Sequence, residues 1–139
     1  MTRSRPRANG GGAGQGQEVP GLARTIGVGE LSELLDRGAG VTVLDIRPAG
    51  ERAEWFVPGS IHHDAYARLR AGDPAALDGV TPPAGIPVVT VCASGVTSEA
   101  AARLLARRGF DARSLAGGMK AWSLAWNTAE LAAPEALLV

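Results

Sequence analysis

The chain carries a single thiol, and the sequence around it is that of a reactive cysteine. Cys92 follows the apolar run "PVVTV" and precedes "ASGVTS", after which an alanine- and leucine-rich helical pattern begins. Main-chain N–H groups at the start of a helix have no partner within the helix and carry partial positive charge. A sulfur placed between a strand and a helix is therefore predicted to face N–H donors, which favour the nucleophilic thiolate.

The residues after the cysteine suit such a ring of N–H donors. Small side chains leave the backbone accessible, and Gly95 permits unusual dihedral angles. Thr97 and Ser98 add hydroxyl donors, and either is expected to cap the helix that follows. Lone cysteines are often inert buried side chains, but this position and loop composition favour function. We predict that a negatively charged group on the sulfur is bound by the loop residues Ala93, Ser94, Gly95, Val96, Thr97 and Ser98.

Asp45 and Arg47 are further candidates, because they end a second apolar run, "VTVLDIR". In parallel sheets, sites form at the carboxyl ends of the strands. Asp45 and Cys92 are therefore expected to lie at the same edge of one sheet. The adjacent His62 and His63 lack the spacing of a catalytic or metal-ligand motif, and we interpret them as a partly exposed strand end without a metal.

The remaining sequence predicts strands alternating with helices. Leu31, Leu34 and Leu35 share a helical face that Gly38 ends. The other predicted elements are a strand over "VTVLDIR", a turn and short helix from Pro48 to Phe56, an extended "VPGSIH", loops with a short helix between Asp64 and Pro87, a strand over "PVVTVC", a helix from Ser98 to Arg108 capped by Gly109, a strand over "DARSL" and a final helix broken near Pro134. Short continuous apolar strands indicate an α/β fold, a parallel sheet with helices on both faces.

Length and composition place these elements in one domain. The chain has 139 residues and a formal net charge of zero, so neither nucleic acid nor an acidic membrane surface is an expected partner. A single cysteine favours a reducing compartment, and no apolar stretch resembles a signal peptide or membrane span, so we expect a cytoplasmic protein. Residues 1–20 are rich in Gly and Arg and are predicted to be a disordered tail before a domain over residues 21–139.

Three blocks together resemble the single-domain rhodaneses, a family of sulfurtransferases. They are "LDIRPAGERAEWFVPGSI", the loop "CASGVTS" and "LAGGMKAW", in that order and at the spacing of the family. The similarity extends over roughly residues 24–126. It implies a rhodanese-like fold with about five parallel strands and flanking helices.

The resemblance also implies a reaction that proceeds through a Cys92 persulfide. The thiolate would take the outer sulfur of thiosulfate, a persulfide or a polysulfide, and pass it to a thiol, cyanide or a sulfur-carrier protein. N–H groups from Ala93 to Thr97 would hold the persulfide, with no metal or organic cofactor. Asp45 would steady the edge of the sheet by hydrogen bonds, and Arg47 is expected to pair with Glu51.

The sequence departs from the family pattern in two places. Members that prefer thiosulfate often carry Arg or Lys just after the cysteine, whereas this chain has Ala93 and Ser94, which leaves persulfide and polysulfide donors open. Phe56 stands where His is usual and Arg52 where an aromatic residue is common. Trp55 and Phe56 are interpreted as core residues, with lining of the pocket as the alternative.

Other functions are compatible with parts of this pattern. Cysteine phosphatases and arsenate reductases use a similar loop but need an arginine six positions after the cysteine, where this chain has Ser98. A cysteine hydrolase would need His62 or His63 as partner. The strongest rival is a weakly catalytic or non-catalytic rhodanese-like module that binds partners or senses sulfide.

Overall fold

The computed structural model describes residues 24–132, and side chains as far as residue 126. The predicted disordered tail and the helix break at Pro134 therefore lie outside the described residues. The strands are β1 Arg24–Ile26, β2 Thr42–Asp45, β3 Ile61–His62, β4 Val88–Val91 and β5 Ala112–Leu115. The helices are α1 Val28–Asp36, α2 Ala49–Glu54, α3 Tyr66–Arg70, α4 Thr97–Arg107 and α5 Gly118–Ala132.

The five strands form one sheet in the order β1-β5-β4-β2-β3, and every pair is parallel. This confirms the predicted α/β class and the five parallel strands. The central strands β2 and β4 are buried along most of their length, which explains why both are continuous apolar runs rather than alternating ones. Strand β1 was not predicted, because its three residues have no periodicity of their own and pair only with β5.

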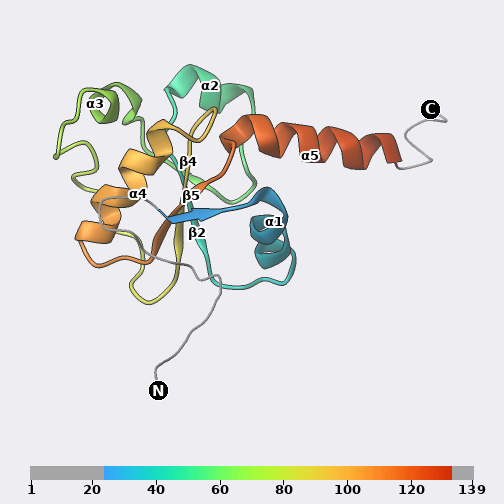
Figure 1. Ribbon diagram of the computed structural model, residues 1–139, viewed down its shortest axis with the longest axis horizontal. Coiled ribbons are helices and arrows are strands. Elements are labelled where there is room, and N and C mark those ends of the chain that lie inside the picture. The colour runs from blue at the N-terminus through green and yellow to red at the C-terminus, as the bar shows by residue number, and fades with distance from the viewer. Residues whose placement is uncertain (1–23, 133–139) are drawn as a thin grey trace.

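Helices cover both faces of the sheet (Figure 1). On one face, α3 and α4 contribute Leu69 and Leu105 to a core that includes Leu44 and Val88. On the other, α1 and α5 contribute apolar side chains that pack with the alternate strand residues: Leu31, Met119, Trp122, Val43 and Val89. Because successive strand side chains point to opposite faces, the sequence position of a residue in β4 decides which core it joins.

The predicted helices are present with small shifts at their ends. Leu31 is fully buried, and Gly38 follows α1 with a φ of 70°. Gly109 likewise follows α4 with a φ of 94°, as expected for a glycine beyond a helix C-terminus. The prediction that Thr97 or Ser98 caps α4 is wrong. Val96 occupies the cap position, and no side chain caps the helix. Within the described residues, no helix combines the length and apolar character needed to cross a membrane.

Leucine side chains of α4 and α5 provide a test of this core. Leu105 is 0% exposed and Leu124 is 67% exposed. Leu105→Ala is expected to lower the free energy of unfolding by about 2–5 kcal/mol, because it leaves a cavity, whereas Leu124→Ala should change it by about 0.5 kcal/mol or less. Urea unfolding followed by circular dichroism measures both, and similar losses in the two variants would contradict the assigned core.

Candidate active site

Cys92 and Asp45 lie at the same edge of the sheet, as predicted. Strand β2 pairs with β4 so that Asp45 is opposite Val91, the residue before the cysteine. The N–H of Ile46 donates to the carbonyl of Val91 at 3.0 Å, which continues the pairing past both strand ends. The topology therefore places the thiol and the carboxylate on neighbouring strands, at the edge where parallel sheets hold their sites.

The loop after Cys92 folds back so that main-chain N–H groups face its sulfur. The N–H of Gly95 donates to Cys92 Sγ at 3.1 Å, and the N–H of Ser98 does so at 3.3 Å. In the part of the chain that the structure describes, the N–H groups of Ala93 and Ser94 make no hydrogen bond. Two donors thus already point at the sulfur, and the N–H groups of Val96 and Thr97, like those of Ala93 and Ser94, make no hydrogen bond within the described residues.

The glycine-rich segment before α5 holds this loop in place. The N–H of Met119 donates to the carbonyl of Cys92 at 2.8 Å, and the N–H of Lys120 donates to that of Ala93 at 2.9 Å. In a planar trans peptide, C=O and N–H point in opposite directions. Fixing these two carbonyls against α5 therefore turns the N–H groups of the next residues, Ala93 and Ser94, away from α5.

This close approach requires glycine at Gly95 and Gly118. Gly95 has a φ of 95°, and a Cβ there would lie 2.9 Å from the nitrogen of Gly117. Gly118 has a φ of 57°, and a Cβ there would overlap the Cys92 carbonyl oxygen and lie 2.7 Å from that of Ala93. A side chain at either position would separate the loop from α5. The shape of the loop "CASGVTS" therefore depends on close packing against the segment "LAGGMKAW".

A chain of hydroxyl groups lies on the inner side of the sulfur. Ser98 Oγ is 3.4 Å from Cys92 Sγ and 2.6 Å from Ser114 Oγ. The hydroxyl of Thr90 donates to the Ser98 carbonyl at 2.7 Å. Sequence analysis did not single out Thr90 or Ser114; the only signal was a hydroxyl residue within each of two otherwise buried strands.

The sulfur is recessed beneath the loop. Cys92 is only 1% exposed and contacts the apolar core on the α4 face, whereas Val96 at the outer part of the loop is 71% exposed. Ser94 is also exposed. A reagent must therefore reach the sulfur past the loop backbone rather than across an open surface.

Asp45 is held by two arginines. Arg47 forms a buried bidentate pair with it, with Nε 2.9 Å from Oδ1 and Nη2 2.8 Å from Oδ2. The expected pairing of Arg47 with Glu51 is wrong, because Arg47 lies two residues after Asp45 on the same side of the extended chain, whereas Glu51 is exposed on α2. Arg52 Nη1 adds a 3.4 Å contact to Oδ2.

The arginine pairing determines the charge of Asp45. Burial by itself raises the pKa of this carboxyl, but hydrogen bonds and the positive charge of Arg47, with a hydrogen bond from Arg52, outweigh it and hold the pKa below its ordinary value. Asp45 is therefore a carboxylate at neutral pH. All described hydrogen bonds of its carboxylate come from the side chains of Arg47 and Arg52 and from the Arg47 main chain, which agrees with the supporting role predicted for it.

Arg52 also contacts Phe56, one of the two aromatic residues near this edge. It donates to the hydroxyl of Ser60 at 2.6 Å, and its guanidinium carbon lies 3.8 Å from the centre of the Phe56 ring. Trp55 and Phe56 are 38% and 43% exposed, so their interpretation as core residues is wrong. The cation stacked on Phe56 replaces the apolar contacts that a core position would provide.

The residues that match a known family extend over most of the chain. Residues 27–125 match the rhodanese-like domain. The chain belongs to this family.

Solved structures agree with this assignment. The rhodanese-like chain is similar to a rhodanese homologue from the extremely thermophilic bacterium Thermus thermophilus, with 30% identity and a TM-score of 0.51 over 70% of this chain and 99% of that one. A rhodanese-like domain protein from Staphylococcus aureus has 26% identity and a TM-score of 0.56 over 71% of this chain and 90% of its own. A rhodanese-related protein from Thermoplasma volcanium has 25% identity and a TM-score of 0.55, covering 71% and 89%.

The two histidines of this rhodanese-like domain make separate main-chain contacts. His62 Nε2 lies 2.7 Å from the Arg47 carbonyl oxygen, and His63 Nε2 lies 3.2 Å from that of Ala76. Among the described residues, neither hydrogen-bonds to Cys92, and no group of three His, Cys, Asp or Glu side chains could hold a metal ion. The histidines therefore give no support to a hydrolase pairing or a metal centre.

The contact between the loop and α5 can be tested with two glycine substitutions. Gly118→Ala introduces a Cβ at a positive φ against loop carbonyls, whereas Gly109→Ala introduces one at a φ of 94° with nothing within 4 Å. Gly118→Ala is expected to cost about 1–3 kcal/mol more of unfolding free energy, because the loop or α5 must shift. Urea unfolding measures the difference, and equal losses would show that only the backbone conformation matters.

The buried Asp45–Arg47 pair predicts how stability depends on pH. Because the folded pKa of Asp45 lies below its ordinary 3.8, the pair stabilises the fold above that pH, and this contribution disappears as pH falls through the lowered value. Asp45→Asn should therefore flatten the acid end of the stability profile. At pH 7 it is expected to cost about 3–5 kcal/mol, since Arg47 is left buried without its partner.

Two further variants control this measurement. Asp78→Asn removes the carboxylate of the largely exposed pair with Arg108 and should have little effect. The double variant Asp45→Asn/Arg47→Met should be more stable than Asp45→Asn alone, because no unpaired guanidinium remains buried. An Asp45→Asn variant as stable as the parent at pH 7 would contradict the role of the pair.

Proposed function

We propose that this rhodanese-like domain is a sulfurtransferase that carries sulfur as a Cys92 persulfide. The observation that supports it most is the pair of N–H groups, from Gly95 and Ser98, that point at Sγ. Such donors favour a thiolate over a thiol, and a thiolate is what attacks a sulfur donor. An inert core cysteine would have no need of two main-chain donors.

The proposed reaction has two steps that conserve atoms and charge. The Cys92 thiolate attacks the outer sulfur of the donor; a new S–S bond forms, the donor's S–S bond breaks, and its electron pair leaves on sulfite or on the donor thiolate. The terminal sulfur of the persulfide carries the negative charge. An acceptor such as a thiolate or cyanide then takes that sulfur, and the Cys92 thiolate is restored.

Ala93 and Ser94 are the proposed main-chain donors to the outer sulfur. Their N–H groups are turned away from α5 and make no hydrogen bond within the described residues. An anionic sulfur bound there would satisfy N–H groups that are otherwise left to solvent. Donation to the outer sulfur by Val96 and Thr97 stays a prediction from the sequence.

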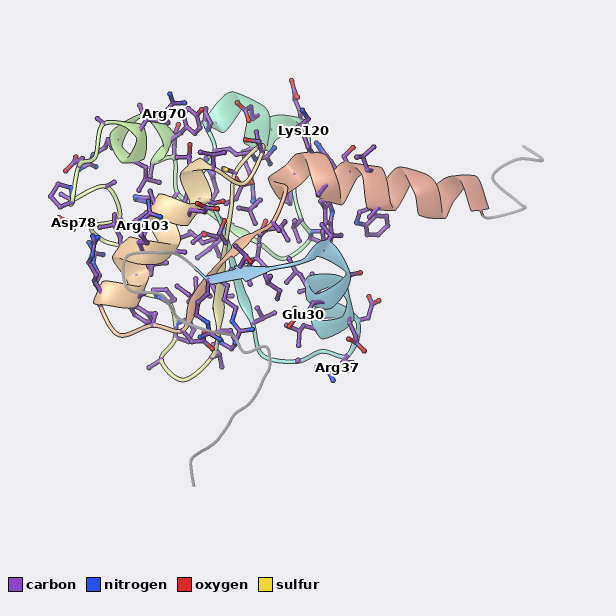
Figure 2. The ribbon with its side chains drawn as sticks, in the orientation of Figure 1. Glu30, Arg37, Arg70, Asp78, Arg103 and Lys120 are labelled. Atoms are coloured by element: carbon purple, nitrogen blue, oxygen red, sulfur yellow. The ribbon has the colours of Figure 1, made fainter. Side chains whose placement is uncertain are left out.

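The donor that fits best is a persulfide or polysulfide. The loop itself has no cation to bind the sulfonate of thiosulfate, since Ala93 and Ser94 are neutral. Lys120, whose main-chain N–H bonds to the Ala93 carbonyl, carries an exposed cationic side chain at the start of α5 (Figure 2). A flexible exposed lysine binds a sulfonate less tightly than a planar arginine in the loop would, so thiosulfate is proposed as a secondary donor.

A rhodanese-like binding or sulfide-sensing module is the second candidate. It is favoured by the low exposure of Cys92, 1%, which restricts access to the sulfur. A phosphatase has less support, because position 98 holds a fully buried serine in place of the arginine that clamps a phosphate. Sulfur transfer distinguishes the two main candidates, since a sensor need not release its sulfur.

Mass spectrometry of the intact protein tests the proposal. Incubation with glutathione persulfide or polysulfide is expected to add about 32 Da, one sulfur atom, which a thiol acceptor then removes. Cys92→Ser should show neither the adduct nor turnover, because no other residue can form a persulfide in a chain with one cysteine. Ser94→Ala, which keeps the main-chain donors, serves as the control for a loop substitution.

Each outcome has a definite reading. An adduct that no acceptor removes would favour the sensing module. No adduct with any donor, in a folded protein, would overturn the sulfurtransferase. Turnover that persists in Cys92→Ser would show that Cys92 is not the sulfur carrier.

A further inference from the structure

We propose that Ser114 is a positioning residue that stabilises the anionic form of Cys92 through Ser98. The three side chains form a line from the loop into the sheet: Sγ to Ser98 Oγ at 3.4 Å, and Ser98 Oγ to Ser114 Oγ at 2.6 Å. Ser114 does not contact the sulfur itself. The inference rests on the proposed function only in taking Cys92 as the reacting thiol.

The hydroxyls lie in an apolar core, where polar groups are costly. Ser98 and Ser114 are both 0% exposed, and their neighbours on this face of the sheet include Leu105 and Ala112. A buried hydroxyl without a partner destabilises the fold by a few kcal/mol. Ser98 and Ser114 avoid this cost by bonding to each other. Apolar residues would avoid it as well, so the presence of two hydroxyls beside a thiol indicates a role that apolar residues could not perform.

The topology places Ser114 under the first turn of α4. Strand β5 pairs with β4 so that Ser114 is opposite Thr90, two residues before Cys92. Side chains two apart in a strand point to the same face, so Thr90, Cys92 and Ser114 all face α4. The Thr90 hydroxyl holds the main chain of Ser98 by donating to its carbonyl at 2.7 Å. The Ser114 hydroxyl contacts the Ser98 hydroxyl and orients it.

The direction of the hydroxyl chain can follow the charge on the sulfur. With a neutral thiol, S–H donates to Ser98 Oγ, the Ser98 hydroxyl donates to Ser114, and the Ser114 hydroxyl lies 3.5 Å from the Gly95 carbonyl that can accept from it. With a thiolate, the Ser98 hydroxyl donates to the sulfur and the Ser114 hydroxyl donates to Ser98 Oγ. The thiol proton is released to solvent, and otherwise only the two hydroxyl hydrogens change direction.

This reversal favours the anion. A dipole that can rotate stabilises a charged neighbour more than a neutral one, as water does at a surface, and hydrogen bonds in a chain strengthen one another. Water is excluded at a sulfur that is 1% exposed. Ser98 and Ser114 supply there two rotatable dipoles in line with the charge.

The test is a pH titration of the thiolate by its ultraviolet absorbance near 240 nm, with Cys92→Ser as the blank. It requires neither a sulfur donor nor access to the sulfur. Ser98→Ala should move the midpoint up by about one pH unit, because a donor to the anion is lost. Ser114→Ala should move it up by about half a unit, and Ser114→Thr, which keeps the hydroxyl, should restore it.

Two comparisons separate positioning from a general structural effect. Ser60→Ala removes a buried hydroxyl that bonds to Arg52 and to the Val57 carbonyl, and not to Cys92, Ser98 or Ser114, so it should leave the midpoint unchanged. If Ser114 acts through Ser98, the double variant Ser98→Ala/Ser114→Ala should shift the midpoint no further than Ser98→Ala alone. Additive shifts, no shift in Ser114→Ala, or an equal shift in Ser60→Ala would each overturn the proposal.

These results are independent of sulfur transfer. If the protein accepts no sulfur but the Ser114→Ala midpoint shifts as expected, the proposed sulfurtransferase function is overturned and the positioning role of Ser114 stands. If sulfur transfer occurs and the midpoint does not move, the opposite holds.

Discussion

Two hydrogen bonds between α5 and the loop set the geometry of the whole site. They join the N–H groups of Met119 and Lys120 to the carbonyls of Cys92 and Ala93. Because a trans peptide holds C=O and N–H in opposite directions, fixing the carbonyls on one side leaves N–H groups on the other. The cysteine loop is therefore shaped by a helix that starts 26 residues later in the sequence, and glycine is required where the two backbones meet.

Polar groups surround the sulfur of Cys92 both from the loop and from the interior of the domain. Its sulfur accepts hydrogen bonds from two N–H groups and lies beside the Ser98–Ser114 hydroxyl pair, all within an otherwise apolar core. On the neighbouring strand, the Asp45 carboxylate pairs with Arg47 and Arg52 and has no described hydrogen bond to the loop. In the proposed reaction, one strand end thus carries the reacting thiol, and the other carries a buried carboxylate paired with two arginines.

The family assignment concerns the fold, whereas the departures from the family pattern concern side chains of the loop. The fold and the position of the loop are those of a rhodanese-like domain. The neutral residues after Cys92 change only what the loop presents to a donor, because its N–H groups come from the backbone and do not depend on side-chain identity. Such a loop can lose a charged side chain and keep its means of stabilising an anion.

The sequence determined the class of fold and the position of the cysteine loop, because both follow from local patterns. Apolar runs and helical periodicity gave the β2, β4 and β5 strands and the main helices, and the strand–cysteine–loop order identified Cys92 and its edge. Tertiary structure alone decided which groups meet across the sheet. Strand β1 exists only as a partner of β5, Arg47 pairs with Asp45 rather than Glu51, and Ser114 reaches Ser98 only through the register of β4 with β5. Register and side-chain pairing depend on contacts between segments distant in the chain, which no local pattern encodes.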